Sequence, residues 1–291
     1  MNTTELKRWV RDLTPPLVYS SLRRLVREGW RRSPPEWEYV PEGWVRAGDD
    51  LRGWNEESVA EAYRSKLTAF CETLDGTGPV AYSSSAALEL GTPNVNDQNT
   101  TLAFAYALLL SSHGRERVSV LDWGGGLGYY SYVARALLPD TVELDYHCKD
   151  MPVICEYGRQ ALPEITFWDD DDCFARQYDF VLASSSLQYS EQWQTTLARL
   201  ARSSTDALFL TRMPMIDDHP SFVVLQRAHH YRFDSEYLSW VFNKGELLRS
   251  ASDAGVELVR EFVLGYQPDV VGAPEQDETW AYLFRRAGGN T

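Results

Sequence analysis

The feature that most constrains this chain is a short apolar stretch that ends in an acid and runs into a glycine-rich turn. Residues 118–130 read VSVLDWGGGLGYY. The apolar residues suit a buried parallel strand, and Gly124, Gly126 and Gly128 let the backbone turn tightly and approach a ligand closely. Such a strand, turn and helix start are typical of doubly wound α/β folds that bind nucleotide-type ligands.

The spacing of the glycines distinguishes between two classes of ligand. The dinucleotide fingerprint G-x-G-x-x-G would need a glycine at position 129, where this chain has Tyr129. Asp122, two residues before the first glycine, would repel a phosphate but could accept hydrogen bonds from a cationic amino-acid group. The sequence therefore favours a sulfonium amino acid over a pyrophosphate at this turn.

Charge and cysteine content exclude several function classes. The formal net charge of −14 argues against a nucleic-acid partner, because a phosphate backbone rewards clustered Lys and Arg. The four cysteines form no C-x-x-C pair, so neither a zinc knuckle nor a disulfide framework is expected. No apolar run approaches the roughly 20 residues of a membrane span. We therefore expect a cytoplasmic protein with no metal, no nucleic acid and no integral membrane association, and a homodimer stays open.

The N-terminal part differs in charge from the rest of the chain. Residues 1–32 carry eight Lys or Arg against three acids. The segment around Trp30 is predicted to form a basic amphipathic helix that lies on an anionic membrane or on the acidic body of the protein. Apolar periodicity predicts further helices at 56–74 and 97–112. Residues 1–112 are thus expected to form a helical cap over the cofactor, and residues 113–291 the cofactor-binding domain.

Beyond residue 113, strand and helix patterns alternate at regular intervals, as in a doubly wound parallel sheet. Seven strands are predicted, at 118–122, 142–148, 164–168, 179–184, 206–212, 257–264 and 279–285. Helices are predicted at 128–138, 151–161, 191–202 and 244–254. The last two strands have only a loop between them, so we expect a mostly parallel seven-stranded α/β sheet whose last strand is antiparallel.

The motif and this strand order resemble the class I S-adenosylmethionine-dependent methyltransferases. Further stretches are similar to a bacterial methyltransferase family often encoded near polysaccharide or natural-product genes, namely DWGGGLGY from 122, MPVICEYGR from 151, LQY from 187, RMPM from 212 and FVVLQ from 222. The resemblance implies a Rossmann-like methyltransferase fold, S-adenosylmethionine as the cofactor and a small-molecule acceptor.

The carboxyl ends of the second and third predicted strands are expected to bind the cofactor. Asp150, followed by Met151, either holds the ribose hydroxyls or caps the next helix. Trp168 offers an aromatic face to an adenine ring, and Asp169 or Asp170 offers a carboxylate to its amine.

Two further segments are candidates for contacts with the methionyl part of the cofactor. Ser184 and Ser185 leave the fourth predicted strand, where methyltransferases place residues that face the methionyl group and the acceptor. The alternative is a simple polar turn. In the N-terminal part, Tyr82 is the candidate contact of the cap.

The reaction favoured by these features is O-methylation of a sugar or natural-product acceptor. A hydroxyl acceptor needs a base, and His219, His229 and His230 follow the fifth predicted strand, on the side where an acceptor would arrive. The alternative for each histidine is a structural role. N- or C-methylation by the same fold and a non-catalytic S-adenosylmethionine-binding scaffold are the other hypotheses.

Overall fold

The computed structural model describes residues 34–46, 54, 57–80, 94–227 and 235–287. The described residues from Glu36 onward belong to one compact unit. The predicted boundary after residue 112 falls inside this unit. The predicted helix around Trp30 and three candidate site residues, Tyr82, His229 and His230, lie outside the described residues. No described helix is long and apolar enough to cross a membrane.

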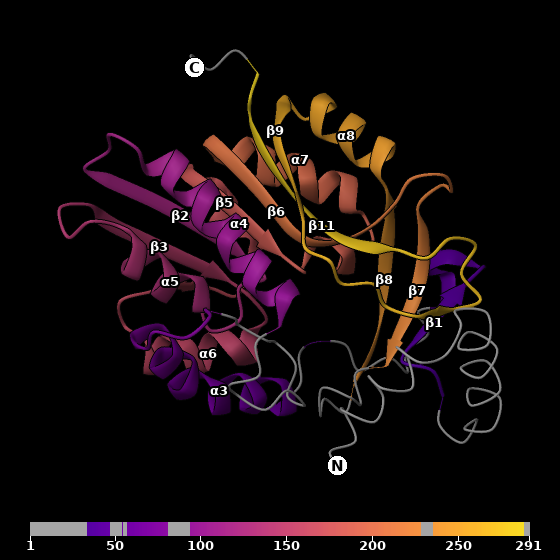
Figure 1. The fold of residues 1–291 in the computed structure, drawn as a ribbon, viewed down its shortest axis with the longest axis horizontal. Helices are drawn as coiled ribbons and strands as arrows, with labels where there is room; N and C mark the ends of the chain where they lie inside the picture. Colours follow the sequence, from indigo (N-terminus) through magenta and orange to yellow (C-terminus); the bar gives the residue numbers. More distant parts are fainter. Residues whose placement is uncertain (1–33, 47–53, 55–56, 81–93, 228–234, 288–291) are drawn as a thin grey trace, which may run out of the picture. The chain divides into compact units, whose positions relative to one another are not determined.

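All seven predicted strands are present and lie side by side in this unit (Figure 1). They are β2 (Arg117–Trp123), β3 (Glu143–Lys149), β4 (Thr166–Trp168), β5 (Tyr178–Ser184), β6 (Ser204–Ile216), β9 (Val256–Val263) and β11 (Glu278–Arg286). Their order is β4–β3–β2–β5–β6–β11–β9. Of these seven strands, β11 alone runs in the opposite direction, so the prediction of an antiparallel last strand is confirmed.

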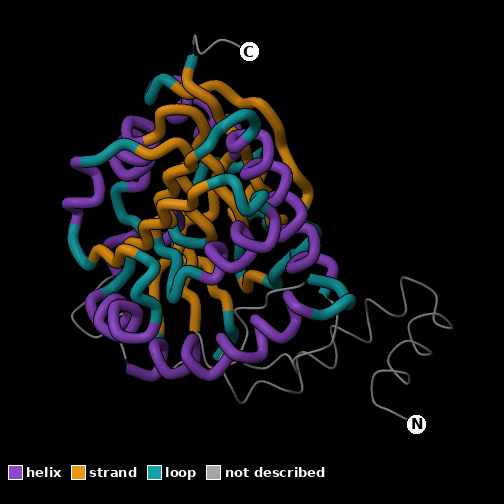
Figure 2. The backbone as a smooth tube through the Cα atoms, turned by 90° about the vertical axis from the view of Figure 1, so that its left-hand side faces the viewer, coloured by secondary structure: helices purple, strands orange, loops and turns teal. Residues whose placement is uncertain are grey.

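Helices cover both faces of this sheet (Figure 2), because its strands are apolar on both sides. Val120 of β2 packs into one core cluster and Leu121 into the other. The first cluster includes residues of α3 (Glu57–Asp75), α4 (Val95–Ser112), α5 (Tyr129–Leu137) and α6 (Pro152–Ala161). The second includes residues of α7 (Trp193–Ser203) and α8 (Lys244–Asp253). The described helices match those predicted from periodicity to within three residues at each end.

Four further strands extend the sheet, so the predicted count of seven is wrong, and the described residues form a sheet of 11 strands. They are β1 (Trp37–Val40), β7 (Phe222–Arg227), β8 (Glu236–Asn243) and β10 (Val270–Val271). β7 pairs antiparallel with β8 and β1, and β1 pairs with β10. These four strands are called the small sheet below.

The small sheet is joined to the main sheet through β6, which continues four residues beyond its predicted end. Met215 and Ile216 pair with Phe242 and Asn243 of β8. All six residues of β7 are buried, because the small sheet packs on both faces. Val224 belongs to the cluster on one face and Val223 to the cluster on the other. The segment expected as a loop after the fifth strand is therefore a hairpin beside the carboxyl end of β6.

Candidate cofactor and acceptor site

The turn between β2 and α5 adopts a backbone that requires glycine. Gly124, Gly126 and Gly128 have φ angles of 75°, 60° and 69°, in the left-handed region. The Gly124 N–H donates to the Lys149 carbonyl at 2.7 Å, which ties the turn to the end of β3. A Cβ at Gly124 would lie 2.4 Å from the Cβ of Ser186. The turn therefore has no room for a side chain at its first glycine.

Asp122 lies beneath this turn and not in contact with the cavity above it. Its side chain is fully buried, and its Oδ2 accepts a hydrogen bond from the Tyr146 hydroxyl at 2.7 Å. A Cβ on Gly125 would lie 2.3 Å from the Asp122 carboxyl group. Burial raises the pKa of Asp122 to about 7. This placement differs from the predicted direct contact with a cationic ligand, since the carboxyl group supports the turn from below.

Asp150 joins the glycine turn to the start of α6. Its Oδ2 accepts from the Gly126 N–H and its Oδ1 from the Met151 N–H, both at 2.7 Å. Burial raises the pKa of this carboxyl group. Each oxygen of the Asp150 carboxylate therefore has a backbone partner. Asp150 and Met151 also line the cavity, so the carboxylate faces the space where a cofactor would lie.

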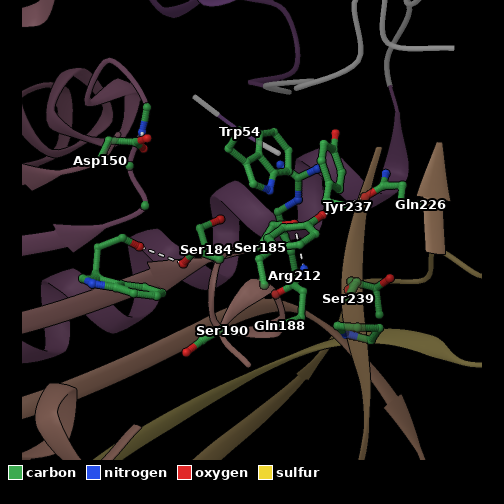
Figure 3. A pocket seen from close by; sticks show the side chains of 18 of the residues that line it. Trp54, Asp150, Ser184, Ser185, Gln188, Ser190, Arg212, Gln226, Tyr237 and Ser239 are labelled. Atoms are coloured by element: carbon green, nitrogen blue, oxygen red, sulfur yellow. Dashed lines mark hydrogen bonds between the residues drawn. The ribbon is translucent and has the colours of Figure 1, made fainter. Parts of the chain in front are cut away.

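A cavity of about 440 Å³ opens above the glycine turn, at the carboxyl edge of the main sheet. Such an edge is where ligands bind in open α/β sheets, and the volume is typical of a small-molecule site. In Figure 3, Asp150 lies at one end of the cavity, Gln226 and Ser239 lie at the other, and Ser184 and Ser185 lie between them. The small sheet contributes Trp37, Val224, Gln226, Tyr237, Ser239, Val241 and Val270 to the wall.

Stacked aromatic rings form part of this wall. Trp54 stacks on Tyr237 of β8 with ring centroids 4.1 Å apart and an angle of 18° between the planes. Tyr189 meets both rings edge-on, at 4.9 Å and 5.4 Å, and its hydroxyl donates to Gln226 Oε1 at 2.9 Å. The N-terminal third also contributes Tyr63 and Asn96 to the lining.

Ser184 and Ser185 line the cavity as predicted from their position after β5. The Ser184 hydroxyl hydrogen-bonds with the Tyr130 hydroxyl at 2.9 Å, and Gln188 Nε2 donates to Ser185 Oγ at 3.0 Å. Ser185 and Arg212, both in the lining, have positive φ angles of 51° and 58°. Left-handed backbone at residues other than glycine is uncommon and tends to occur at functional sites.

Five of the predicted cofactor-binding residues lie outside the cavity lining, and most have structural partners instead. Trp168 Nε1 donates to His147 Nδ1 at 3.1 Å. Asp169 pairs with Arg159 at 3.0 Å, and this hydrogen-bonded guanidinium lowers the pKa of Asp169. Asp170 accepts a hydrogen bond from the Asp172 N–H, which caps a short 3₁₀ helix. Gly128 and Asp122 are the other two residues of this group, since neither of them lines the cavity.

His219 lies in the turn between β6 and β7, outside the cavity lining. Its backbone N–H donates to Glu275 Oε2 at 2.7 Å, and its Nδ1 is 2.8 Å from the Pro220 carbonyl oxygen. The structure therefore does not bring His219 together with the glycine turn.

Sequence reasoning missed several polar residues of the cavity, above all Asp277. This residue, directly before β11, is 2% exposed and lines the cavity, and burial raises its pKa to about 7. Arg212 was named only as part of a sequence resemblance. The place of Arg212 at the predicted end of the fifth strand is a sequence signal that could have identified it. The loop before β11 carries no such signal for Asp277.

Known proteins resemble the chain in three-dimensional structure but not in sequence. No protein-family model and no curated protein sequence matches it. The 1,6-didemethyltoxoflavin-N1-methyltransferase of Burkholderia thailandensis, solved with S-adenosylhomocysteine, is 15% identical with a TM-score of 0.44, over 65% of this chain and 78% of that chain. The magnesium protoporphyrin IX methyltransferase of Synechocystis, also solved with S-adenosylhomocysteine, is 13% identical with a TM-score of 0.44, over 79% and 98% of the two chains.

Proposed function

We propose that this chain binds S-adenosylmethionine at the glycine turn and transfers its methyl group to a hydroxyl of a small-molecule acceptor. One observation carries the proposal. The turn after β2 excludes a side chain at Gly124, is joined by Asp150 to the end of β3, and opens onto a cavity at the carboxyl edge of the sheet. The absence of glycine at position 129, where the chain has Tyr129, argues against a dinucleotide at this turn.

The residues at one end of the cavity fit the cofactor. Gly124 and Gly126 leave backbone exposed for close approach, Asp150 offers the remaining lone pairs of its carboxylate to ribose hydroxyls, and Ser184 and Ser185 face the middle of the cavity. When bound, S-adenosylmethionine supplies a methyl group that is already activated by its sulfonium.

The rest of the cavity would position the acceptor and exclude water. Trp54, Tyr189 and Tyr237 form an apolar wall opposite the glycine turn, which would hold an acceptor in line with the methyl group and keep bulk water away. A hydroxyl acceptor also loses a proton during transfer, so the proposal includes a nearby base.

The reaction is tested by incubating the protein with S-adenosylmethionine labelled in the methyl group and a panel of sugars, phenols and amines. The proposal expects label on the oxygen of a small-molecule product and stoichiometric S-adenosylhomocysteine. Label on nitrogen or carbon would assign N- or C-methylation instead. Cofactor binding with no labelled product from any acceptor would favour the scaffold hypothesis.

Asp150→Ala is expected to weaken binding of S-adenosylhomocysteine by roughly 1 to 3 kcal/mol, the range for losing a charged hydrogen-bonding partner. The variant loses the two backbone contacts at Gly126 and Met151 together with any ribose contact. Calorimetric titration measures the change. The matched control is Asp170→Ala, which removes an acid outside the cavity lining, and equal affinities for the two variants would contradict the assigned role of Asp150.

The three histidines are expected to differ in their effect on the transfer rate. His219→Ala should keep the rate within about twofold, because His219 does not line the cavity. If His229 or His230 is the base, its replacement by alanine should lower the rate by roughly 10² to 10⁴ and leave S-adenosylhomocysteine affinity unchanged. Single-turnover rates of the three variants measure this. Wild-type rates in all three would remove histidine from the mechanism.

A further inference from the structure

The cavity is longer than the cofactor end alone requires. It spans the carboxyl ends of β3, β2, β5 and β6 and reaches residues just before β11. Adjacent strands lie about 4.8 Å apart, so β11 is roughly 10 Å across the sheet from β5. Thr279 of β11 pairs with Pro214 of β6, and both line the cavity. An acceptor whose reacting atom lies over β5 would therefore extend toward the start of β11.

Asp277 is the acid at this far end of the cavity. It is 2% exposed, and its Oδ1 has no hydrogen-bond partner among the described residues. No salt bridge joins it to a Lys or Arg in the described part of the chain. A buried carboxylate with no cation beside it and no donor to one of its oxygens is costly, so this side chain fits a ligand that supplies both a charge and a donor.

The other charged groups of the cavity lie elsewhere along it. Lys149 and Asp150 belong to the end of β3, four strands from β11, and Arg212 lies on β6. None of these three contributes to the pKa of Asp277, which burial raises and a hydrogen bond from its own backbone lowers.

The surroundings of Asp277 suit a cation with an apolar body. Trp37 pairs with Val270, whose backbone N–H and carbonyl bond to the side chain of Gln276, next to Asp277. The Tyr266 carbonyl accepts from the Thr279 N–H at 2.8 Å. Trp37, Tyr266 and Val270 all line the cavity, and aromatic faces attract cations.

We propose that Asp277 is a specificity-determining residue that binds a protonated amine on the acceptor, at the end of the molecule remote from the methylated atom. This inference rests on the proposed function only in that it calls the bound amine a methyl acceptor. The predicted binding of an amine by Asp277 does not depend on methyl transfer. An ammonium group supplies the charge that the buried carboxylate lacks and a hydrogen-bond donor for its Oδ1. A hydroxyl would supply a donor without the charge.

The test uses the full chain saturated with S-adenosylhomocysteine and two probes of equal shape, 2-phenylethylamine and 2-phenylethanol. The amine is expected to bind at least about tenfold more tightly than the alcohol in calorimetry or ligand-observed NMR. Asp277→Asn, which keeps the shape and removes the charge, should abolish this difference. Asp172→Asn, on the exposed 3₁₀ helix before β5, is the matched control and should keep it.

Titrations in two buffers with different ionisation enthalpies give a second readout. Because burial holds the pKa of Asp277 near 7, amine binding at pH 7 should release a fraction of a proton, and Asp277→Asn should release none. Absence of amine binding, equal affinities for the two probes, or an unchanged preference in Asp277→Asn would each overturn the inference. Failure of S-adenosylhomocysteine to bind in the first place would instead overturn the proposed function.

Discussion

Gly124→Ala is expected to lower the affinity for S-adenosylhomocysteine by at least about 100-fold, close to 3 kcal/mol. The added Cβ would lie 2.4 Å from the Cβ of Ser186, and the φ of 75° is strained for any residue with a side chain. Ser186 cannot move away freely, because its hydroxyl donates to the Trp123 carbonyl at 2.7 Å. The turn must therefore shift out of the shape that approaches the ligand, and calorimetry on the folded variant measures the loss.

Gly114→Ala separates the clash from the backbone strain. Gly114 has a φ of 73°, but a Cβ there has no atom within 4 Å, and the residue lies before β2, away from the cavity. This control should lose some stability and keep wild-type affinity. The double variant Gly124→Ala/Ser186→Gly removes the Cβ that is struck and should recover part of the binding. Wild-type affinity in Gly124→Ala would contradict the assigned role of the turn.

The free energy of unfolding is expected to fall as pH rises from about 4 to about 7. Asp122 and Asp277 are buried with pKa values of about 7, against 3.8 as the ordinary value. Because their folded pKa values are raised, the folded state binds more protons than the unfolded state in this window, so stability is lost with rising pH and is level above it. A shift of one pKa unit corresponds to about 1.4 kcal/mol, so two groups that are each shifted by roughly 3 units give a combined loss of at most about 9 kcal/mol.

Asp277→Asn should remove the contribution of Asp277 to this pH dependence of the free energy of unfolding. We expect the variant to be more stable than the wild type at pH 8 by about 1 to 4 kcal/mol and nearly equal to it at pH 4. Urea unfolding across this range measures the difference. Parallel pH profiles for the variant and the wild type would show that Asp277 does not titrate in the predicted window.

The main sheet could be predicted from the sequence because its strands are mostly short and apolar and alternate with amphipathic helices. In β2, Val118, Val120 and Leu121 are buried, and they face both sides of the sheet, which produces a mostly apolar stretch. The small sheet was missed for a different reason. β1 carries a single buried residue, Val40, in a proline- and glycine-punctuated stretch. β7 pairs with β8, the next strand along the chain, and with β1, which is distant in sequence.

The residues of the candidate site also fall into those that could be predicted from the sequence and those that could not. Positions fixed by the turn and by strand ends could be predicted, and Gly124, Asp150 and Ser184 do line the cavity. Asp169 and Asp170 were assigned from position alone, but a neighbouring Arg159 and the cap of a 3₁₀ helix hold them elsewhere. Asp277 could not be predicted, because its burial depends on the small sheet and on the loop before β11 rather than on a local pattern.

Calorimetric titration of the wild-type chain with S-adenosylhomocysteine, and separately with NAD, tests the central claim most directly. The turn with Asp122 beneath it and Tyr129 in place of a third fingerprint glycine should bind S-adenosylhomocysteine at one site per chain. NAD should bind at least about 100-fold more weakly, because the turn lacks the glycine that a pyrophosphate requires. Equal or tighter binding of NAD, or no binding of S-adenosylhomocysteine, would contradict the assignment of this cavity to a methyl donor.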